Sequence, residues 1–240
     1  IRRGFIPGEP DMSLLAADYS QVELRVLAHC SGDETLRQAF REDRDIHRFV
    51  ASQIHGVSED EVTAEMRQQA KAVNFGIVYG QSPYGLSSAI DVPVEEAREF
   101  IDSYFQRYPR VKEFIGRTIA QARENGYVRT LAGRRRAITG INSSGTVRSA
   151  AERVAVNSVI QGSAADLIKR AMVTVSRGLI DVSERGAMLL QIHDELVFEV
   201  PDADLDAVQD FVTREMSGAM ELAVPLKVET AVGKNWEEAK

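Results

Sequence analysis

The segment AMLLQIHDELVFEV, residues 187–200, decides how this sequence folds. Two runs of apolar residues enclose the polar triplet His193-Asp194-Glu195. A helix would carry these three polar or charged residues inside an otherwise apolar surface. Two short strands joined by a tight turn instead leave the triplet at the tip. The segment therefore predicts a β-hairpin with Asp194 at its tip.

The rest of the chain predicts strands at both ends and helices between them. Residues 12–18 read as a short buried strand that ends in a second carboxylate, Asp18. A helix over 204–222 and a strand over 226–232 follow the hairpin. The other expected elements are helices over 22–40, 46–55, 58–79 (opened by a Ser58/Glu61 capping box and ended by Gly80), 94–108, 111–125 and 149–177, with a loop containing a short hairpin over 126–146. This order predicts an α+β fold rather than repeated βαβ units.

Composition limits the class of protein. The chain has 240 residues, 44% hydrophobic and 27% charged, enough to bury a core in one large domain or two small ones. A lone cysteine, Cys30, excludes an internal disulfide framework and fits a reducing setting, so we expect a cytoplasmic protein. No run approaches the roughly 18 apolar residues of a membrane span. Because the first residue is Ile1, we expect a piece of a longer protein.

Charge is distributed unevenly along the chain. The net charge is −7, but residues 1–106 carry −8, residues 107–177 carry +10 and residues 178–240 carry −9. A basic middle third between acidic flanks suggests a nucleic-acid-binding surface beside an acidic surface that binds cations. Charge alone fits a solvated basic helix face equally well.

Two groups of residues suggest chemistry. Asp18 and Asp194, at neighbouring strand ends, would repel each other unless a cation lay between them, and Mg²⁺ commonly uses one or two carboxylates plus substrate phosphates. The alternative is that both are ordinary turn residues. The second group is a stripe of two cations and two aromatics at four-residue spacing on one expected helix: Arg67, Lys71, Phe75 and Tyr79. It suits a triphosphate at one end and a ring at the other, although solvated cations beside core aromatics remain an alternative.

Together these segments resemble the family A DNA polymerases. Residues 18–25 (DYSQVELR) resemble the first palm motif of that family, residues 67–80 (RQQAKAVNFGIVYG) its fingers helix, and residues 193–195 (HDE) its second palm motif. Shorter matches are Asp45-Ile46-His47, Glu152-Arg153, Asn157, Gln161-Gly162 and the terminal Gly233-Lys234-Asn235-Trp236. The similarity covers nearly the whole chain, in family order and spacing.

The resemblance implies an antiparallel palm sheet with an inserted helical fingers subdomain. Palm would comprise residues 1–40 and 146–240, and fingers residues 41–145. The thumb and any exonuclease domain would precede Ile1, so we expect weak, salt-sensitive DNA binding by this chain. The implied activity is template-directed DNA synthesis, adding dNTPs to a primer 3′-hydroxyl with release of pyrophosphate. The implied partners are primer–template DNA and dNTPs, without a membrane, and we expect a monomer.

The resemblance also implies a role for each matching residue. Two Mg²⁺ ions would be held by Asp18, Asp194 and the carbonyl of Tyr19, with Glu195 as a supporting carboxylate and Lys71 as the proton donor to pyrophosphate. The dNTP-binding residues would be Gln21, Glu23, His47, Arg67, Lys71, Phe75 and Tyr79, where Glu23 crowds the ribose 2′ position. The primer–template would be contacted by Arg153, Asn157, Gln161 and His193.

The sequence departs from the family pattern at Gln68, where a second Arg is usual, so one electrostatic contact would be missing. Phe75 resembles the residue of members that discriminate against dideoxynucleotides. Three rival functions remain. A single-subunit RNA polymerase would need room where Glu23 stands. A folded but non-catalytic DNA-binding fragment is the second. A two-metal nuclease or phosphatase is the third, and it would leave the fingers stripe without a function.

Overall fold

The computed structural model describes residues 1–239, which form two compact units. The first, which we call the sheet unit, joins Ile1–Val22 to the chain from Ala165 onward. The second, which we call the helical unit, is Glu23–Ala164. One long helix, α8 (Gly145–Val182), passes from the helical unit into the sheet unit.

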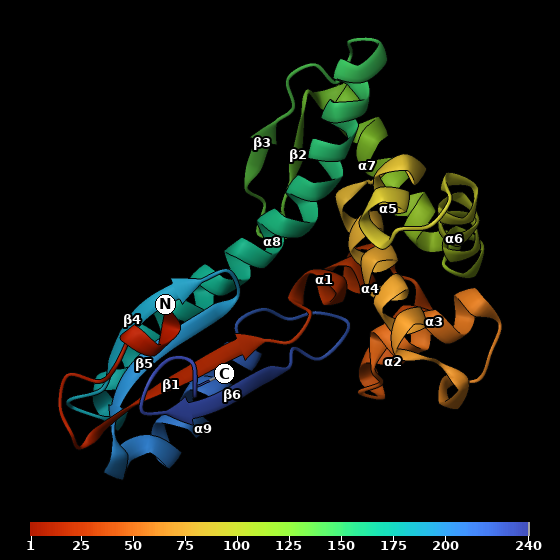
Figure 1. The fold of residues 1–240 in the computed structure, drawn as a ribbon. Helices are drawn as coiled ribbons and strands as arrows, with labels where there is room; N and C mark the ends of the chain where they lie inside the picture. The colour runs from red at the N-terminus through yellow and green to blue at the C-terminus, as the bar shows by residue number, and fades with distance from the viewer. Residues whose placement is uncertain (240) are drawn as a thin grey trace. The chain divides into compact units, whose positions relative to one another are not determined.

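The sheet unit is built on a four-stranded antiparallel sheet with the order β4-β5-β1-β6 (Figure 1). Its strands are β1 (Met12–Tyr19), β4 (Ala187–Ile192), β5 (Glu195–Pro201) and β6 (Val228–Gly233). The expected hairpin over 187–200 and the expected strand over 12–18 are therefore confirmed. Antiparallel pairing throughout the sheet agrees with the expected α+β class.

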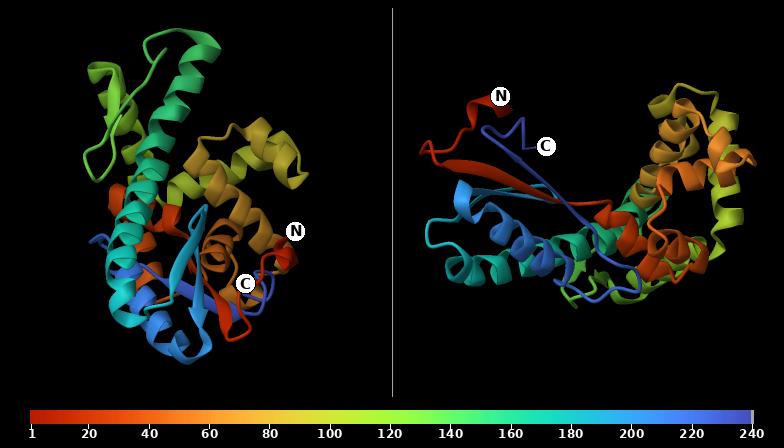
Figure 2. Two further views of the ribbon diagram at one scale, coloured as in Figure 1. Left: turned by 90° about the vertical axis from the view of Figure 1, so that its left-hand side faces the viewer. Right: turned by 90° about the horizontal axis from the view of Figure 1, so that it is seen from below.

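The two faces of the sheet are covered differently. Leu14 and Ala16 of β1 pack with Trp236, near the end of the chain. Tyr19 points to the opposite face, where its hydroxyl donates to the carbonyl of Met216 in α9 (Leu205–Ser217) at 2.7 Å. The right-hand view of Figure 2 shows α9 and the end of α8 on one side of the sheet and the terminal segments on the other. Alternation along β1 thus places Asp18 on the Leu14 face, away from α9.

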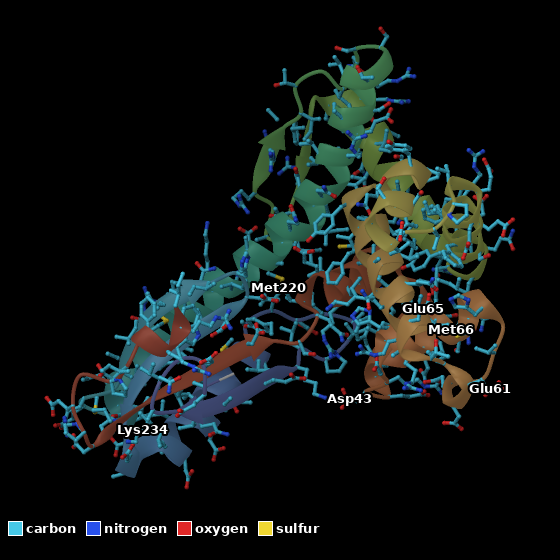
Figure 3. All side chains as sticks on the ribbon, viewed as in Figure 1. Asp43, Glu61, Glu65, Met66, Met220 and Lys234 are labelled. Carbon is cyan, nitrogen blue, oxygen red and sulfur yellow. The ribbon has the colours of Figure 1, made fainter. Side chains whose placement is uncertain are left out.

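The terminal segments are tied to the sheet by polar contacts. Lys234, labelled in Figure 3, follows β6 and donates from Nζ to the carbonyl of Met12 and to Asp202, each at 2.8 Å. Asp202 also accepts from the Ser13 hydroxyl at 2.6 Å. These bonds join the segment after β6 to the start of β1 and the end of β5.

The helical unit contains helices and one small hairpin. The helices are α1 (Val22–Ser31), α2 (Glu34–Arg41), α3 (Ile46–His55), α4 (Ala64–Tyr79), α5 (Pro83–Ile90), α6 (Val94–Arg107) and α7 (Pro109–Asn125). The hairpin pairs β2 (Tyr127–Arg129) with β3 (Arg135–Ala137), and a short 3₁₀ turn, η2 (Glu59–Glu61), precedes α4. Two further 3₁₀ turns, η1 (Arg2–Gly4) and η3 (Asp202–Asp204), belong to the sheet unit. None of the helices within residues 1–239 is both long enough and apolar enough to cross a lipid bilayer.

One expected helix start was wrong. The Ser58/Glu61 capping box exists, but it caps the start of the short turn η2 only. Val62 then returns to an extended conformation and is buried, so the long helix α4 starts at Ala64 with Thr63 as its N-cap. Its other end was predicted correctly, because Gly80 adopts the left-handed conformation that closes the helix.

Other boundaries shifted for local reasons. The run over 22–40 is two helices, because Asp33 is the N-cap of a second helix, α2, and its side chain accepts from the backbone N–H of Leu36. Ser82 is the N-cap of the unpredicted helix α5, with Pro83 in its first position. The helix expected over 149–177 extends over Gly145–Val182, and the one expected over 204–222 stops at Ser217.

Candidate active site

The β4–β5 hairpin brings the two predicted metal-binding aspartates to one end of the sheet. Ile192 pairs with Glu195, so His193 and Asp194 form a two-residue turn. The backbone N–H of Tyr19 donates to the carbonyl of Asp194 at 3.3 Å, and Asp18 lies opposite Glu195 in the β1–β5 register. Asp18 and Asp194 are both partly exposed. Backbone pairing therefore brings Asp18 and Asp194 to the same end of the sheet, as the sequence predicted.

The backbone beside both aspartates adopts an uncommon conformation. His193, in the hairpin turn, has φ 55°, and Gln21, three residues after Asp18, has φ 54°. Residues other than glycine rarely enter this left-handed region, and when they do they cluster at functional sites. A bond from the side-chain amide of Gln191 to the carbonyl of His193, at 2.6 Å, fixes the turn. The His193 side chain remains exposed.

Glu195 is buried and has a specific partner. It is 6% exposed, and its Oε1 accepts from the indole N–H of Trp236 at 2.5 Å. Trp236 is itself enclosed by Phe5, edge-on at 5.4 Å, and by the guanidinium of Arg2, 4.6 Å from the ring centre. An indole N–H can only donate, so Glu195 is the acceptor in this contact.

The donor set at this end of the sheet suits hard divalent cations. Asp18 and Asp194 supply carboxylate oxygens, which Mg²⁺ prefers. Because the Tyr19 side chain is committed to Met216, only the backbone carbonyl of Tyr19 is available to a metal. Within the described part of the chain, no three His, Cys, Asp or Glu side chains gather into a complete metal site. A metal held here would therefore need further ligands from water or substrate phosphates.

The predicted stripe on α4 lies on the outward side of that helix. Lys71 and Tyr79 are exposed and Phe75 is partly exposed, whereas Ala70, Val73 and Ile77 are buried. The alternative that the aromatics are core residues is therefore wrong for Tyr79 and only partly true for Phe75. Their rings stack on each other with centroids 6.2 Å apart.

Partners from outside α4 fix two members of the stripe. Arg67 donates from Nε to Asp45 at 2.7 Å, and Asp45 also caps α3. The Arg67 contact and the cap bonds outweigh burial and lower the pKa of Asp45. At the other end of the stripe, the Tyr79 hydroxyl donates to Glu23 at 3.2 Å. Glu23, the residue expected to crowd the ribose, is therefore held by Tyr79 of the stripe.

His47 is buried next to the stripe. It is 4% exposed, and its ring centre lies 6.1 Å from that of Phe75. Burial, and after it the charges of Arg67 and Lys71, lower the pKa of His47 to about 4, although Asp45 opposes the shift. At neutral pH the imidazole is therefore uncharged. Its Nδ1 lies 3.2 Å from the amide nitrogen of Asn74.

The predicted DNA-contacting residues of α8 share one face of that helix. Arg153, Asn157 and Gln161 recur every four residues, and Arg153 and Gln161 are exposed. The Oδ1 atom of Asn157 is buried without a hydrogen-bond partner among the described residues. Arg153 also packs against Gly80, where an added Cβ would lie 2.9 Å from Cγ of the arginine.

Part of the basic middle third forms an exposed arginine surface. Arg134, Arg135 and Arg136 are all exposed on or beside the β2–β3 hairpin. Tyr127 lies between the guanidinium groups of Arg129 and Arg135, 5.4 Å and 4.9 Å from its ring centre. A surface cavity of about 470 Å³ adjoins this hairpin along α7. An aromatic ring among arginines is a composition that suits stacking on nucleic acid.

Sequence reasoning missed the partners that hold these residues. Trp236 and Asp45 were noticed only as parts of a resemblance, not as partners of Glu195 and Arg67. The position of Asn74 among apolar neighbours on α4 is the signal that could have revealed a buried polar contact.

Comparisons with known proteins agree with one another. The sequence model described as DNA polymerase family A matches residues 1–238. The DNA polymerase I of Caldicellulosiruptor bescii is 51% identical and that of Bacillus caldotenax 49% identical over 241 residues. Each alignment covers 100% of this chain and 28% of the relative, so the chain spans about a quarter of their length. A solved structure described as the POL domain of Pol1 from M. smegmatis in complex with DNA primer–template and dNTP matches with a TM-score of 0.94 at 43% identity, over 100% of this chain and 42% of that one.

Proposed function

Because this chain belongs to DNA polymerase family A, we propose that it carries the catalytic residues for template-directed addition of deoxynucleotides to a primer 3′-hydroxyl, with release of pyrophosphate. The observation that carries the proposal is the β1–β5 register, which holds Asp18 beside the hairpin turn with Asp194. In this proposal the palm comprises residues 1–40 and 146–240, and the fingers residues 41–145.

Asp18, Asp194 and the Tyr19 carbonyl would hold two Mg²⁺ ions. When bound, such a pair lowers the pKa of the primer hydroxyl and offsets the charge of the triphosphate and of the leaving pyrophosphate. Glu195, fixed by Trp236, would support the same carboxylate group. Lys71 would give a proton to the departing pyrophosphate as a general acid.

The residues on and beside α4 would bind the incoming nucleotide. Arg67 has five N–H donors, and its bond to Asp45 leaves others for a phosphate. Lys71 and the neutral His47 would contact the same triphosphate, and Phe75 would pack on the sugar and base. Tyr79 would lie near the templating position.

Glu23 would select deoxyribose by crowding the 2′ position, with Gln21 beside it. The bond from Tyr79 restricts the Glu23 side chain, which supports a steric role. On the DNA side, Arg153, Asn157 and Gln161 would contact the minor groove near the reacting end, and His193 the primer terminus. Minor-groove acceptors are common to all base pairs, so these contacts would sense pairing without sequence preference.

The test is primer extension on a primed template with Mg²⁺ and four dNTPs, comparing the chain with Asp194→Ala. Asp210→Ala is the matched control, because Asp210 is an exposed aspartate of α9. Extension that disappears in Asp194→Ala alone would support the proposal. Equal extension by both variants would refute it.

Two rival functions predict different results. A DNA-binding fragment that folds but is too truncated to turn over would bind primed DNA without extending it, and a longer chain would restore extension. A ribonucleotide polymerase would not depend on Glu23 to select its substrate. If Glu23→Ala fails to raise ribonucleotide incorporation, the steric role of Glu23 is wrong.

A further inference from the structure

Asn74 occupies an unusual position in α4. It is 1% exposed and lies between the buried residues Val73 and Ile77. Asparagine lowers helix stability, and a buried amide is costly unless it forms hydrogen bonds. Its side-chain nitrogen lies 3.2 Å from Nδ1 of His47, on α3, although 27 residues separate the two in sequence. His47 is therefore the hydrogen-bond partner of this buried amide.

The chemistry of this contact assigns the tautomer of His47. An amide nitrogen only donates, so Nδ1 of the imidazole must accept. A neutral imidazole carries one hydrogen, which must then be on Nε2. The ring is neutral at pH 7, because burial and the charges of Arg67 and Lys71 lower the pKa of His47 to about 4.

We propose that Asn74 is a positioning residue that holds His47 as the Nε2–H tautomer, so that an uncharged imidazole donates a hydrogen bond to the incoming triphosphate. The inference rests on the proposed function, because it takes His47 as a triphosphate ligand. The opposite tautomer would direct the lone pair of Nε2 at phosphate oxygens, which repel it. Asn74 thus converts a ring with two possible states into a fixed donor.

The charged surroundings favour a neutral ring. Arg67 and Lys71 approach from α4, while Asp45 caps the helix that carries His47. The other elements packed on α3 direct their carboxylates elsewhere: in α2 Glu34 pairs with Arg41, Glu96 of α6 acts on His55, and Glu59 of η2 pairs with Arg44. The carboxylate that acts on His47 is therefore already paired with Arg67. A donor that does not depend on protonation keeps its contact with phosphate across the pH range of catalysis.

The first test reads the tautomer directly. Nitrogen-15 NMR of the histidine rings in the full chain, at pH 6–8, should show Nδ1 of His47 as an unprotonated acceptor and Nε2 as protonated. His47→Gln assigns the signals by their loss, and His55, whose ring lies edge-on to Phe100, serves as an internal reference. A protonated Nδ1 with a bare Nε2 overturns the inference without any variant of Asn74.

The second test reverses the contact while preserving its shape. In Asn74→Asp a carboxylate accepts from Nδ1–H, so Nε2 can donate only while the ring is doubly protonated. The KM for dNTP should then rise with pH, by on the order of tenfold between pH 6 and 8, whereas the unaltered protein stays flat. Asn125→Asp makes the same change at the exposed end of α7 and should also stay flat. A flat profile for Asn74→Asp overturns the inference.

The two tests separate this inference from the proposed function. If His47→Gln leaves the KM for dNTP unchanged, His47 is not a triphosphate ligand, and that part of the proposed function fails whatever NMR shows. If His47→Gln raises KM but NMR finds the other tautomer, only the role of Asn74 fails. Asn74→Leu, which cannot donate, should raise KM several-fold with little change in kcat.

Discussion

The end of the sheet and the outward face of α4 place their functional groups by different means. At the sheet, backbone bonds set the positions. Asp18 lies within the β1 ladder, and Asp194 is in a turn whose carbonyl accepts from the N–H of Tyr19. We therefore expect most substitutions of neighbouring side chains to leave these groups in place, because main-chain hydrogen bonds hold them.

On α4, side chains from other segments set the positions. Asp45 holds Arg67, and Glu23 accepts from Tyr79. These tethers can be changed one at a time while the helix stays intact. From this comparison we expect polymerisation to fall sharply when a carboxylate at the sheet end is removed. On the α4 face we expect smaller losses, whose size depends on which partner residue is changed.

The largest effect should follow from removing a carboxylate at the sheet end. Asp18→Asn keeps the shape but removes a metal ligand, so we expect polymerisation to fall by on the order of a thousandfold. Without metal, Tm should be unchanged or higher, because one of two neighbouring negative charges is gone. Single-turnover extension and calorimetry measure the two quantities, with Asp210→Asn as the control. A large loss of Tm would mean that Asp18 is needed for folding rather than for chemistry.

On α4 we expect a smaller effect, in which the changes in kcat and in KM for dNTP can be separated. Lys71→Arg keeps the positive charge but replaces the ammonium with a group that does not give up its proton. It should lower kcat about a hundredfold while KM for dNTP changes little, whereas Lys71→Gln should impair both. Steady-state kinetics separate the two parameters. If the arginine variant retains kcat, Lys71 acts by charge alone and is not the general acid.

The sequence predicted the features that depend on local pattern. The apolar runs around residues 193–195 gave the hairpin, and four-residue spacing placed Arg67 and Tyr79 on one side of a helix. It predicted poorly where two local signals compete, as at Ser58 and Thr63, which both resemble helix caps. It could not predict contacts between distant segments, because such pairs leave no periodic trace. The bond between Trp236 and Glu195 is the clearest case.

That unpredicted bond provides a way to test whether the sheet end also depends on a side-chain tether. Trp236→Phe keeps a ring between Phe5 and Arg2 but removes the donor to Glu195. Losing a buried hydrogen bond to a charged group costs about 1.5–3 kcal/mol of stability. We expect kcat to fall about tenfold, with a higher Mg²⁺ concentration at half-maximal rate.

A double-mutant cycle checks the origin of that effect. If Trp236 acts through Glu195, adding Trp236→Phe to Glu195→Gln should lower kcat little further. Equal and additive losses would show that Trp236 only stabilises the packing around Leu14 and Ala16. The sheet end would then depend on backbone register alone.

The last expected effect is on stability rather than on rate, and it concerns His47. In the folded chain its pKa is about 4, below the ordinary value of 6.5. As pH falls from 6.5 to 4, the unfolded chain therefore takes up a proton that the folded chain does not, and the free energy of unfolding falls. The loss across this window is on the order of 3 kcal/mol. Denaturant unfolding at several pH values measures it.

His47→Gln is the matched comparison, because glutamine cannot take up that proton. Its stability should vary less between pH 6.5 and 4, although His29 and His55, whose pKa values burial also lowers, leave part of the slope. Asp45, with its lowered pKa, loses its contribution only below this window, so the two groups can be separated by pH. An unchanged slope would mean that His47 is as accessible to protons when folded as when unfolded. The α4 face would then lack the buried, neutral hydrogen-bond donor that we propose for it.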